Sequence, residues 1–241
     1  MLTEKPMGFQ CRQFYLKDDQ CAMKVSTDSL LFGAWVQVGM AQRILDMGTG
    51  CGILALMLAQ RSAATAMIEA VELDPNAAIQ AQQNVLASPW SDKIVITQGD
   101  VITAAYRENQ YDLIVMNPPY FANHLASASK ERELARQGTG DIWQAWLQRA
   151  AQLLAPNGRI AVVAPIQALD TIVAELAAMN LQVACQCMVQ STPKKAPYLV
   201  LFEFVRDSEE QTAKFEELVI RDEVGHYTVS FKQITKDFYL N

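Results

Sequence analysis

The chain has 241 residues, of which 51% are hydrophobic and 19% are charged, so it contains enough apolar material for the core of one large or two small domains. It has no apolar run of 18 residues and no signal-peptide core at its start, which argues against a membrane protein or a secreted protein. The net charge of −6 argues mildly against a nucleic-acid-binding protein, although a local basic patch matters more than the total charge.

Short β-like runs alternate with helical patterns from residue 43 onward. Strands are predicted at 43–48, 66–73, 93–100, 111–117, 158–165, 181–190 and 197–205, and helices at 53–62, 75–87, 141–155 and 167–179. This alternation predicts an α/β fold with a seven-stranded, mostly parallel sheet and helices on both faces. Only residues 191–196 separate the last two strands, which are therefore expected to form an antiparallel hairpin at the end of the sheet.

A single domain with additions at both ends is expected. Residues 1–42 precede the alternating core, residues 43–206 form that core, and residues 207–241 form a C-terminal extension. The extension ends in the aromatic-rich stretch HYTVSFKQITKDFYLN, which predicts a docked segment rather than a loose tail. Five scattered cysteines fit neither a disulfide framework nor a zinc site, so we expect no metal and a cytoplasmic location.

The first strand runs into the glycine-rich turn DMGTGCG, in which Asp46, Gly48, Gly50 and Gly52 occupy alternate positions. Glycines let the backbone turn tightly and approach a ligand closely, and the helix that follows offers free N–H groups. The spacing G-x-G-x-G differs from the dinucleotide pattern G-x-G-x-x-G. The acidic residue before the turn suits a ligand that carries positive groups better than an anion.

Acidic residues end the next two predicted strands. Glu72 and Asp74 follow the second strand, where a carboxylate can accept hydrogen bonds from both ribose hydroxyls, and Asp100 follows the third, where it can accept one from an adenine amino group. Each acid alone is equally consistent with an ordinary surface carboxylate. At the carboxyl ends of successive strands, together with the glycine turn, they predict a site for an adenosine-containing cation, S-adenosylmethionine.

The fourth predicted strand stops at Asn117, Pro118, Pro119 and Tyr120. The stretches DMGTGCG, VELDP, QGD and NPPY stand in the order found in class I S-adenosylmethionine-dependent methyltransferases, and the sequence resembles their amino-group branch. This resemblance implies a Rossmann-like methyltransferase fold. It also implies methylation of a conjugated nitrogen: adenine N6, cytosine N4 or a glutamine amide.

The motif suits that chemistry, because a conjugated nitrogen is a poor nucleophile and must become tetrahedral as it takes the methyl group. The Asn117 side-chain oxygen and the Pro118 carbonyl are candidate acceptors for its N–H groups, and this contact strengthens in the transition state. Asn117 is also a candidate cofactor contact. Tyr120 offers a flat face for the substrate, with Phe121 beside it. The alternative is a turn that merely ends a strand.

Adenine in DNA, adenine in RNA and protein glutamine remain as substrates at this point. The stretches KVSTDSLLFGAW, ASKERELAR, KAPYLVLFEF and YTVSFKQITKDFYL extend the resemblance over essentially the whole chain. They resemble the bacterial tRNA1(Val) (adenine(37)-N6)-methyltransferase family, which implies tRNA as the partner and the adenosine 3′ of the anticodon as the target. The runner-up is a protein-glutamine N5-methyltransferase that acts on a release factor, and a non-catalytic cofactor-binding or RNA-binding module is the third possibility.

The resemblance also implies roles for residues outside the motifs. Thr27 would close over the methionine end of the cofactor, as part of a lid formed by residues 1–42, although the stretch STDS lacks a glycine expected there. The candidate RNA contacts are basic residues in two loops, Lys130, Arg132 and Arg136 in one and Lys194 and Lys195 in the other. No obligate protein partner is implied.

Overall fold

The computed structural model describes residues 8–118, 143–207 and 212–239, and its centre is a sheet of eight strands in the order β10-β8-β9-β7-β6-β3-β4-β5. The strands are β3 (Arg43–Met47), β4 (Met67–Glu72), β5 (Ile94–Gln98), β6 (Tyr111–Met116), β7 (Leu154–Pro165), β8 (Leu181–Gln190), β9 (Leu199–Arg206) and β10 (Lys214–Val219). Only β9 runs against its neighbours. The seven predicted strands and the antiparallel pairing of the last two are thus confirmed, but that hairpin does not form the edge of the sheet. An eighth strand, β10, is added by the C-terminal extension and pairs in parallel with β8.

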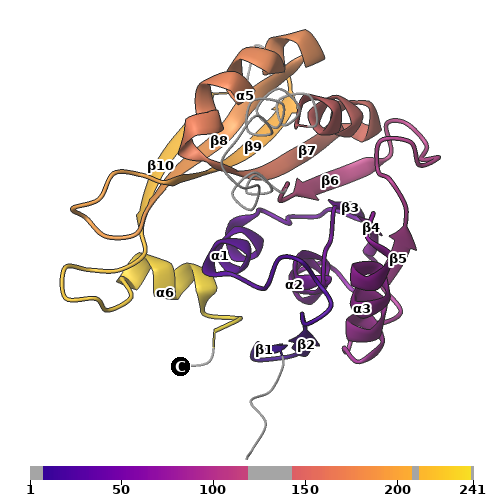
Figure 1. Ribbon diagram of the computed structural model, residues 1–241. Coiled ribbons are helices and arrows are strands. Elements are labelled where there is room, and N and C mark those ends of the chain that lie inside the picture. The colour runs from indigo at the N-terminus through magenta and orange to yellow at the C-terminus, as the bar shows by residue number, and fades with distance from the viewer. Residues whose placement is uncertain (1–7, 119–142, 208–211, 240–241) are drawn as a thin grey trace, which may run out of the picture.

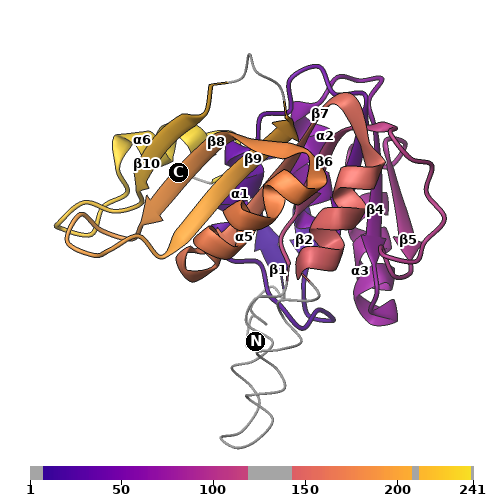
Figure 2. The same ribbon diagram turned by 90° about the horizontal axis from the view of Figure 1, so that it is seen from above.

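Helices cover both faces of this sheet (Figure 1). One face carries α1 (Thr27–Trp35), α2 (Ile53–Arg61), α3 (Pro75–Leu86) and α6 (Val229–Thr235). The other face carries a helix over 143–153 and α5 (Leu169–Leu176), which lie across the sheet when it is seen from above (Figure 2). A small separate hairpin of β1 (Gly8–Gln10) and β2 (Tyr15–Lys17) lies near α3.

The central strands are continuously apolar because both of their faces are buried. On β3, Ile44 belongs to the hydrophobic cluster beneath α1 and α2, whereas the next residue, Leu45, belongs to the cluster beneath α5. Leu113 and Ile114 of β6 are divided in the same way. Alternate side chains of a strand point to opposite faces, so helices on both faces require apolar residues at every position.

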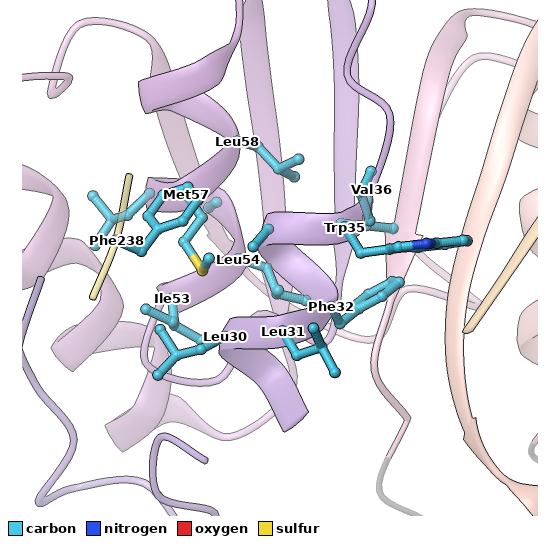
Figure 3. Packing of buried hydrophobic residues seen from close by; sticks show 14 of the residues in the cluster. Leu30, Leu31, Phe32, Trp35, Val36, Ile53, Leu54, Met57, Leu58 and Phe238 are labelled. Atoms are coloured by element: carbon cyan, nitrogen blue, oxygen red, sulfur yellow. The ribbon is translucent and has the colours of Figure 1, made fainter. Parts of the chain in front are cut away.

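The N-terminal helix α1 is part of the main core, as Figure 3 shows. Its start is fixed by a capping box, in which Ser26 and Ser29 each accept from the other's backbone N–H. Phe32 is fully buried, and a side chain at Gly33 would meet the Met57 sulfur of α2 at 2.6 Å. The two helices therefore pack closely, and each large side chain buried there contributes about 1.5–3 kcal/mol.

The C-terminal extension is docked on the same face, as its aromatic residues predict. Phe231 and Phe238 are each 1% exposed, and Figure 3 places Phe238 beside Met57 of α2. The backbone N–H of Arg12 donates to the Phe238 carbonyl at 3.0 Å, and the Arg12 Nε donates to the Tyr239 carbonyl at 2.8 Å. Residues from both ends of the chain thus share one core with the sheet, although the assignment of a single domain stays a prediction.

The five cysteines are free, and four of them are buried. Within residues 8–118, 143–207 and 212–239, no group of three or more His, Cys, Asp or Glu side chains could hold a metal ion. None of the helices in these ranges is long and apolar enough to cross a membrane.

Candidate active site

A pocket of ≈ 740 Å³ opens at the carboxyl ends of the parallel strands. Five of the predicted site residues line it: Gly48, Gly50, Glu72, Asp100 and Asn117. Parallel α/β sheets place their ligands at this edge, and the volume is typical of a site for a small molecule. The motifs that lie apart in the sequence therefore face one cavity.

The glycine turn needs its glycines for two reasons. Gly48, Gly50 and Gly52 all have positive φ, at 73°, 57° and 87°, a region that other residues rarely adopt. In addition, a side chain at Gly48 would lie 2.5 Å from the ring of Trp146, whereas one at Gly50 would meet no atom within 4 Å. Gly48 thus serves close packing, and Gly50 leaves room in the pocket.

Glu72 is held at the end of β4 by two backbone donors. Its Oε2 accepts from the N–H of Gly50 at 2.8 Å, and its Oε1 accepts from the N–H of Asp74 at 2.9 Å. Each carboxylate oxygen has a second acceptor position, so the side chain can also accept from a ligand. Asp74 is used differently, because its side chain caps α3 by accepting from the N–H of Ala77.

Asp46 is fully buried and is not among the residues that line the pocket. Its Oδ2 accepts from the Thr49 hydroxyl at 2.6 Å and from the Ala55 N–H at 3.1 Å, and so joins the glycine turn to α2. The other oxygen, Oδ1, is buried and has no hydrogen-bond partner among the described residues. Burial raises the pKa of this carboxyl to about 7, against the two hydrogen bonds, which lower it. Gly52 also lies outside the lining residues, at the start of α2.

Asp100 lies beside an apolar wall that the sequence analysis missed. Its side chain accepts from the N–H of Ile102 at 2.9 Å, which shapes the turn after β5. Leu73, Val101 and Ile102 line the pocket next to it. These side chains offer apolar contact to a flat ring, and the Asp100 carboxylate lines the same pocket.

The electrostatics of the pocket favour a cation. Glu72, Asp74 and Asp100 line it, and no Lys or Arg does so within the described part of the chain. A site for a dinucleotide would need donors for its phosphates, whereas three carboxylates suit a ligand with ammonium or sulfonium groups.

Asn117 stands where β6 ends, half-buried at the pocket, and its side chain has no hydrogen-bond partner within the described ranges. Pro118, the next residue in the chain, is buried. Six residues of interest lie outside the described residues: Pro119, Tyr120, Phe121, Lys130, Arg132 and Arg136. The acceptor role of Asn117 and Pro118 stays a prediction, and the position of Asn117 at the pocket is compatible with it.

The N-terminal segment reaches the pocket through residues other than Thr27. Gln20, Cys21, Ala22 and Met23 line it, whereas Thr27 is the first residue of α1 and does not. Gln80, which is 1% exposed on α3, accepts from the Gln20 N–H at 3.0 Å and from the Cys21 thiol at 3.3 Å. Because these partners lie about sixty residues away from Gln80, no local pattern in the sequence points to the contact.

A second contact missed from the sequence lies on the other side of Asn117. Tyr198 donates to the Asp28 carboxylate at 2.6 Å. Burial and this hydrogen bond both raise the pKa of the Tyr198 phenol. Tyr198 precedes β9, whose first residue, Leu199, is paired with the last residue of β7, Pro165. The pair therefore lies along the same edge of the sheet as Asn117, on the side away from β5.

Lys194 and Lys195 lie in the turn between β8 and β9, exposed to solvent. Because β8 is parallel to β6 in the sheet, this turn also lies at the carboxyl edge. The Lys194 ammonium lies 3.4 Å from the Glu223 carboxylate, an exposed pair that contributes little stability. Neither lysine lines the pocket, so both remain candidates for contacts farther out on the substrate.

Comparison with known proteins gives a consistent result. Residues 21–182 match the family model of the methyltransferase small domain. A tRNA1(Val) (adenine(37)-N6)-methyltransferase of Pectobacterium carotovorum is 44% identical over 240 residues, with 99% of this chain and 96% of the relative covered. The protein of the same description from Histophilus somni (strain 129Pt) is 41% identical over 244 residues, covering 98% of this chain and 99% of the relative.

Solved structures agree on the fold. A predicted O-methyltransferase from Agrobacterium tumefaciens matches with a TM-score of 0.67 and 16% identity, covering 87% of this chain and 95% of its own. The glycopeptide N-methyltransferase MtfA, determined with S-adenosylmethionine, matches with a TM-score of 0.57 and 14% identity over 78% of this chain and 97% of its own. At this identity the likeness establishes the class I methyltransferase fold alone.

Proposed function

Because the chain belongs to the tRNA1(Val) (adenine(37)-N6)-methyltransferase family, we propose that it transfers a methyl group from S-adenosylmethionine to N6 of adenosine 37 in tRNA1(Val). The observation that carries the proposal is similarity over nearly the full length of relatives of this description, with 44% identity to one of them. The pocket adds support, because Asn117 lines the same cavity as the glycine turn.

The residues present fit S-adenosylmethionine, which supplies an electrophilic methyl group on a positively charged sulfur. Glu72 would accept from the ribose hydroxyls, since its two backbone donors already hold the carboxylate in position. Asp100 would accept from the adenine amino group, with Val101 and Ile102 against the ring. The acidic lining would favour the cation throughout the pocket.

Asp46, Gly52 and Thr27 would then act indirectly. Asp46 would hold the turn through Thr49 and Ala55, and Gly52 would start α2 behind it. Thr27 would position the N-terminal segment, while Gln20–Met23 would cover the cofactor. Residues 1–42 would therefore still form the lid, but its contacts with the cofactor would come from Gln20–Met23 and not from Thr27.

Catalysis would rest on acceptors at the end of β6. The adenine amino group is a weak nucleophile because its lone pair is delocalised into the ring. The Asn117 side-chain oxygen and the Pro118 carbonyl would accept from its two N–H groups and favour the tetrahedral nitrogen of the transition state. No side chain needs to remove a proton first, because the nitrogen becomes acidic once it is methylated.

The protein-glutamine alternative has less support, since the curated relatives that cover the whole chain are described as tRNA adenine-N6 enzymes. The proposal places the enzyme in the cytoplasm with tRNA as its partner. To test it, the protein is incubated with methyl-labelled S-adenosylmethionine and tRNA without natural modifications, and the nucleosides are separated. We expect label in N6-methyladenosine. Label in a release-factor fraction instead of RNA would replace the proposal with the glutamine alternative.

A further inference from the structure

We propose that the C-terminal extension is an RNA-binding surface, in which Arg221, Lys232 and Lys236 hold phosphate groups of the tRNA outside the catalytic pocket. This inference rests on the proposed function and extends it to a part of the chain for which neither a motif nor the pocket assigns a role. We call these three residues the tail cations.

Two of the tail cations lie on α6 and at its C-terminal end, because Lys232 is within the helix and Lys236 is its C-cap residue. Lys232 and Lys236 are four residues apart, so they lie one helical turn from each other, and both are exposed. They flank a hollow of ≈ 680 Å³ that Tyr227, Phe231, Thr235 and Tyr239 also line. Two cations beside an aromatic-lined hollow form the combination that binds single-stranded or looped nucleic acid.

The third tail cation is held in a fixed orientation. The Arg221 guanidinium lies 4.1 Å over the ring of Tyr227, and its Nη1 donates to the Gly225 carbonyl at 2.7 Å. Tyr227 is itself stacked on the buried Phe231, with ring centroids 4.7 Å apart and an interplanar angle of 18°. Arg221 is nevertheless exposed to solvent. A guanidinium fixed before binding loses less entropy when it contacts a phosphate or a base.

Two of the acids near this surface, Asp222 and Glu223, are already engaged. Asp222 accepts from the N–H groups of Val224 and His226, and Glu223 lies 3.4 Å from Lys194. Within the described ranges, no carboxylate forms an ion pair with any of the tail cations. The chain as a whole has a net charge of −6, which repels a polyanion. Binding of RNA therefore requires a local group of cations that are not neutralised by carboxylates, such as the tail cations.

The surface is continuous with the substrate side of the active site. The N–H of Arg221 donates to the carbonyl of Ser191 at 3.0 Å, which joins the end of β10 to the turn that holds Lys194 and Lys195. At the other end, burial raises the pKa of the Tyr239 phenol, and a hydrogen bond with the Thr27 side chain lowers it by a smaller amount. Thr27 is next to Asp28, the acceptor of Tyr198. A tRNA whose loop adenosine is at Asn117 can therefore extend over this surface.

The test compares two double variants. Lys232→Gln/Lys236→Gln removes two tail cations, and Arg43→Gln/Arg107→Gln removes two exposed cations from a shallow depression at the opposite, amino-terminal edge of the sheet. Binding of fluorescent tRNA is measured over a range of salt concentrations, together with KM for tRNA, kcat and S-adenosylmethionine affinity. Lys232→Arg/Lys236→Arg, which keeps both charges, serves as the rescue.

We expect the first variant to reduce the slope of log Kd against log salt concentration by about 1.4–1.8. Its KM for tRNA should rise, while kcat and cofactor affinity stay unchanged, and the arginine variant should behave like the wild type. The control should keep the full slope. If the wild-type protein methylates tRNA but the two glutamine double variants have the same salt slope and the same KM for tRNA, the inference is wrong and the proposed function still stands. If wild-type protein neither binds nor methylates tRNA, the proposed function fails and the inference fails with it.

Discussion

On the cofactor side of the site, Glu72 and Asp100 accept hydrogen bonds from backbone N–H groups. On the substrate side, the Asp28 carboxylate accepts from a side chain that lies far away in the sequence. Glu72 accepts from the N–H groups of Gly50 and Asp74, which belong to the glycine turn and to its own strand end. Asp28 instead accepts from Tyr198, 170 positions away. The cofactor-side carboxylates are therefore held by the turns of adjacent strands, whereas Asp28 is held by a contact between the N-terminal segment and the residue before β9.

This difference predicts that the two sides respond separately to substitution. Changes at the end of β6 or in the 191–198 turn should alter methyl transfer or RNA binding and leave the cofactor affinity intact. Changes around the glycine turn should do the reverse. A substitution on one side that strongly affects the function of the other side would show that the two sides are not independent.

The largest effect is expected from Asn117→Ala. Loss of the acceptor should lower the rate of methyl transfer by roughly 10²–10³-fold, because the hydrogen bond strengthens in the transition state. Cofactor affinity should change little, since Glu72 and Asp100 are unaffected. Single-turnover kinetics and calorimetric titration with the cofactor measure the two quantities. Asn117→Asp keeps acceptor oxygens and should retain more activity than the alanine variant, and equal activity in all three proteins would contradict the role of Asn117.

The second effect concerns pH and Asp46. The folded protein holds the proton of this carboxyl up to a pKa of about 7, whereas an unfolded chain releases it near its ordinary value of 3.8. Stability from this group is therefore lost as the pH rises from that value to about 7. Between pH 5 and pH 8, the free energy of unfolding should fall by roughly 2–3 kcal/mol on account of Asp46.

Urea unfolding at several pH values measures that fall, with Asp46→Asn as the comparison. The asparagine variant has no carboxyl to titrate at this position, so its unfolding free energy should vary with pH by that much less than the wild type. Parallel curves for the two proteins would show that Asp46 does not hold a proton near neutral pH.

A third and smaller effect is expected from Glu72→Gln. A glutamine side chain has only one acceptor oxygen, so it cannot replace both carboxylate oxygens that face Gly50, Asp74 and the ribose. The cofactor Kd should therefore rise about tenfold. The rate at saturating cofactor should be nearly unchanged. Glu108→Gln, an exposed residue in the loop before β6, is the matched control and should bind the cofactor normally. A large loss of rate at saturating cofactor would mean that Glu72 also serves the substrate side.

The smallest effect is expected from the Tyr198–Asp28 pair. Tyr198→Phe should raise KM for tRNA several-fold without changing the cofactor Kd. In a double-mutant cycle with Asp28→Asn, unfolding should reveal a coupling of about 0.5–1.5 kcal/mol, the usual net value for one intramolecular hydrogen bond, because this bond is only partly buried. A coupling near zero would show that the two side chains do not depend on each other.

The same division explains which features the sequence could predict. The strands and the glycine turn follow from local patterns, because alternating apolar runs and positive-φ glycines act within a few residues. Trp146, Gln80 and Tyr198 were missed because their partners, Gly48, Gln20 and Asp28, lie far along the chain. Nothing in their immediate neighbours distinguishes them from ordinary core or surface residues.

Strand β10 was missed for another reason. Its sequence, KFEELV, lies at the edge of the sheet with Phe215 exposed and only Leu218 fully buried, so it lacks the apolar run of a central strand. Edge strands are defined by a single neighbour, here β8, and charged residues are common in them. The C-terminal extension therefore contributes to the sheet without a clear local signal.

The most direct test of the account compares two tRNA1(Val) transcripts, one with its natural sequence and one in which adenosine 37 is replaced by guanosine. Both are incubated with the protein and methyl-labelled S-adenosylmethionine, and the label in each RNA is measured. The account predicts N6-methyladenosine in the first transcript and none in the second. Equal label in both transcripts would contradict the assignment of the target adenosine, and no label in either would contradict the proposed reaction.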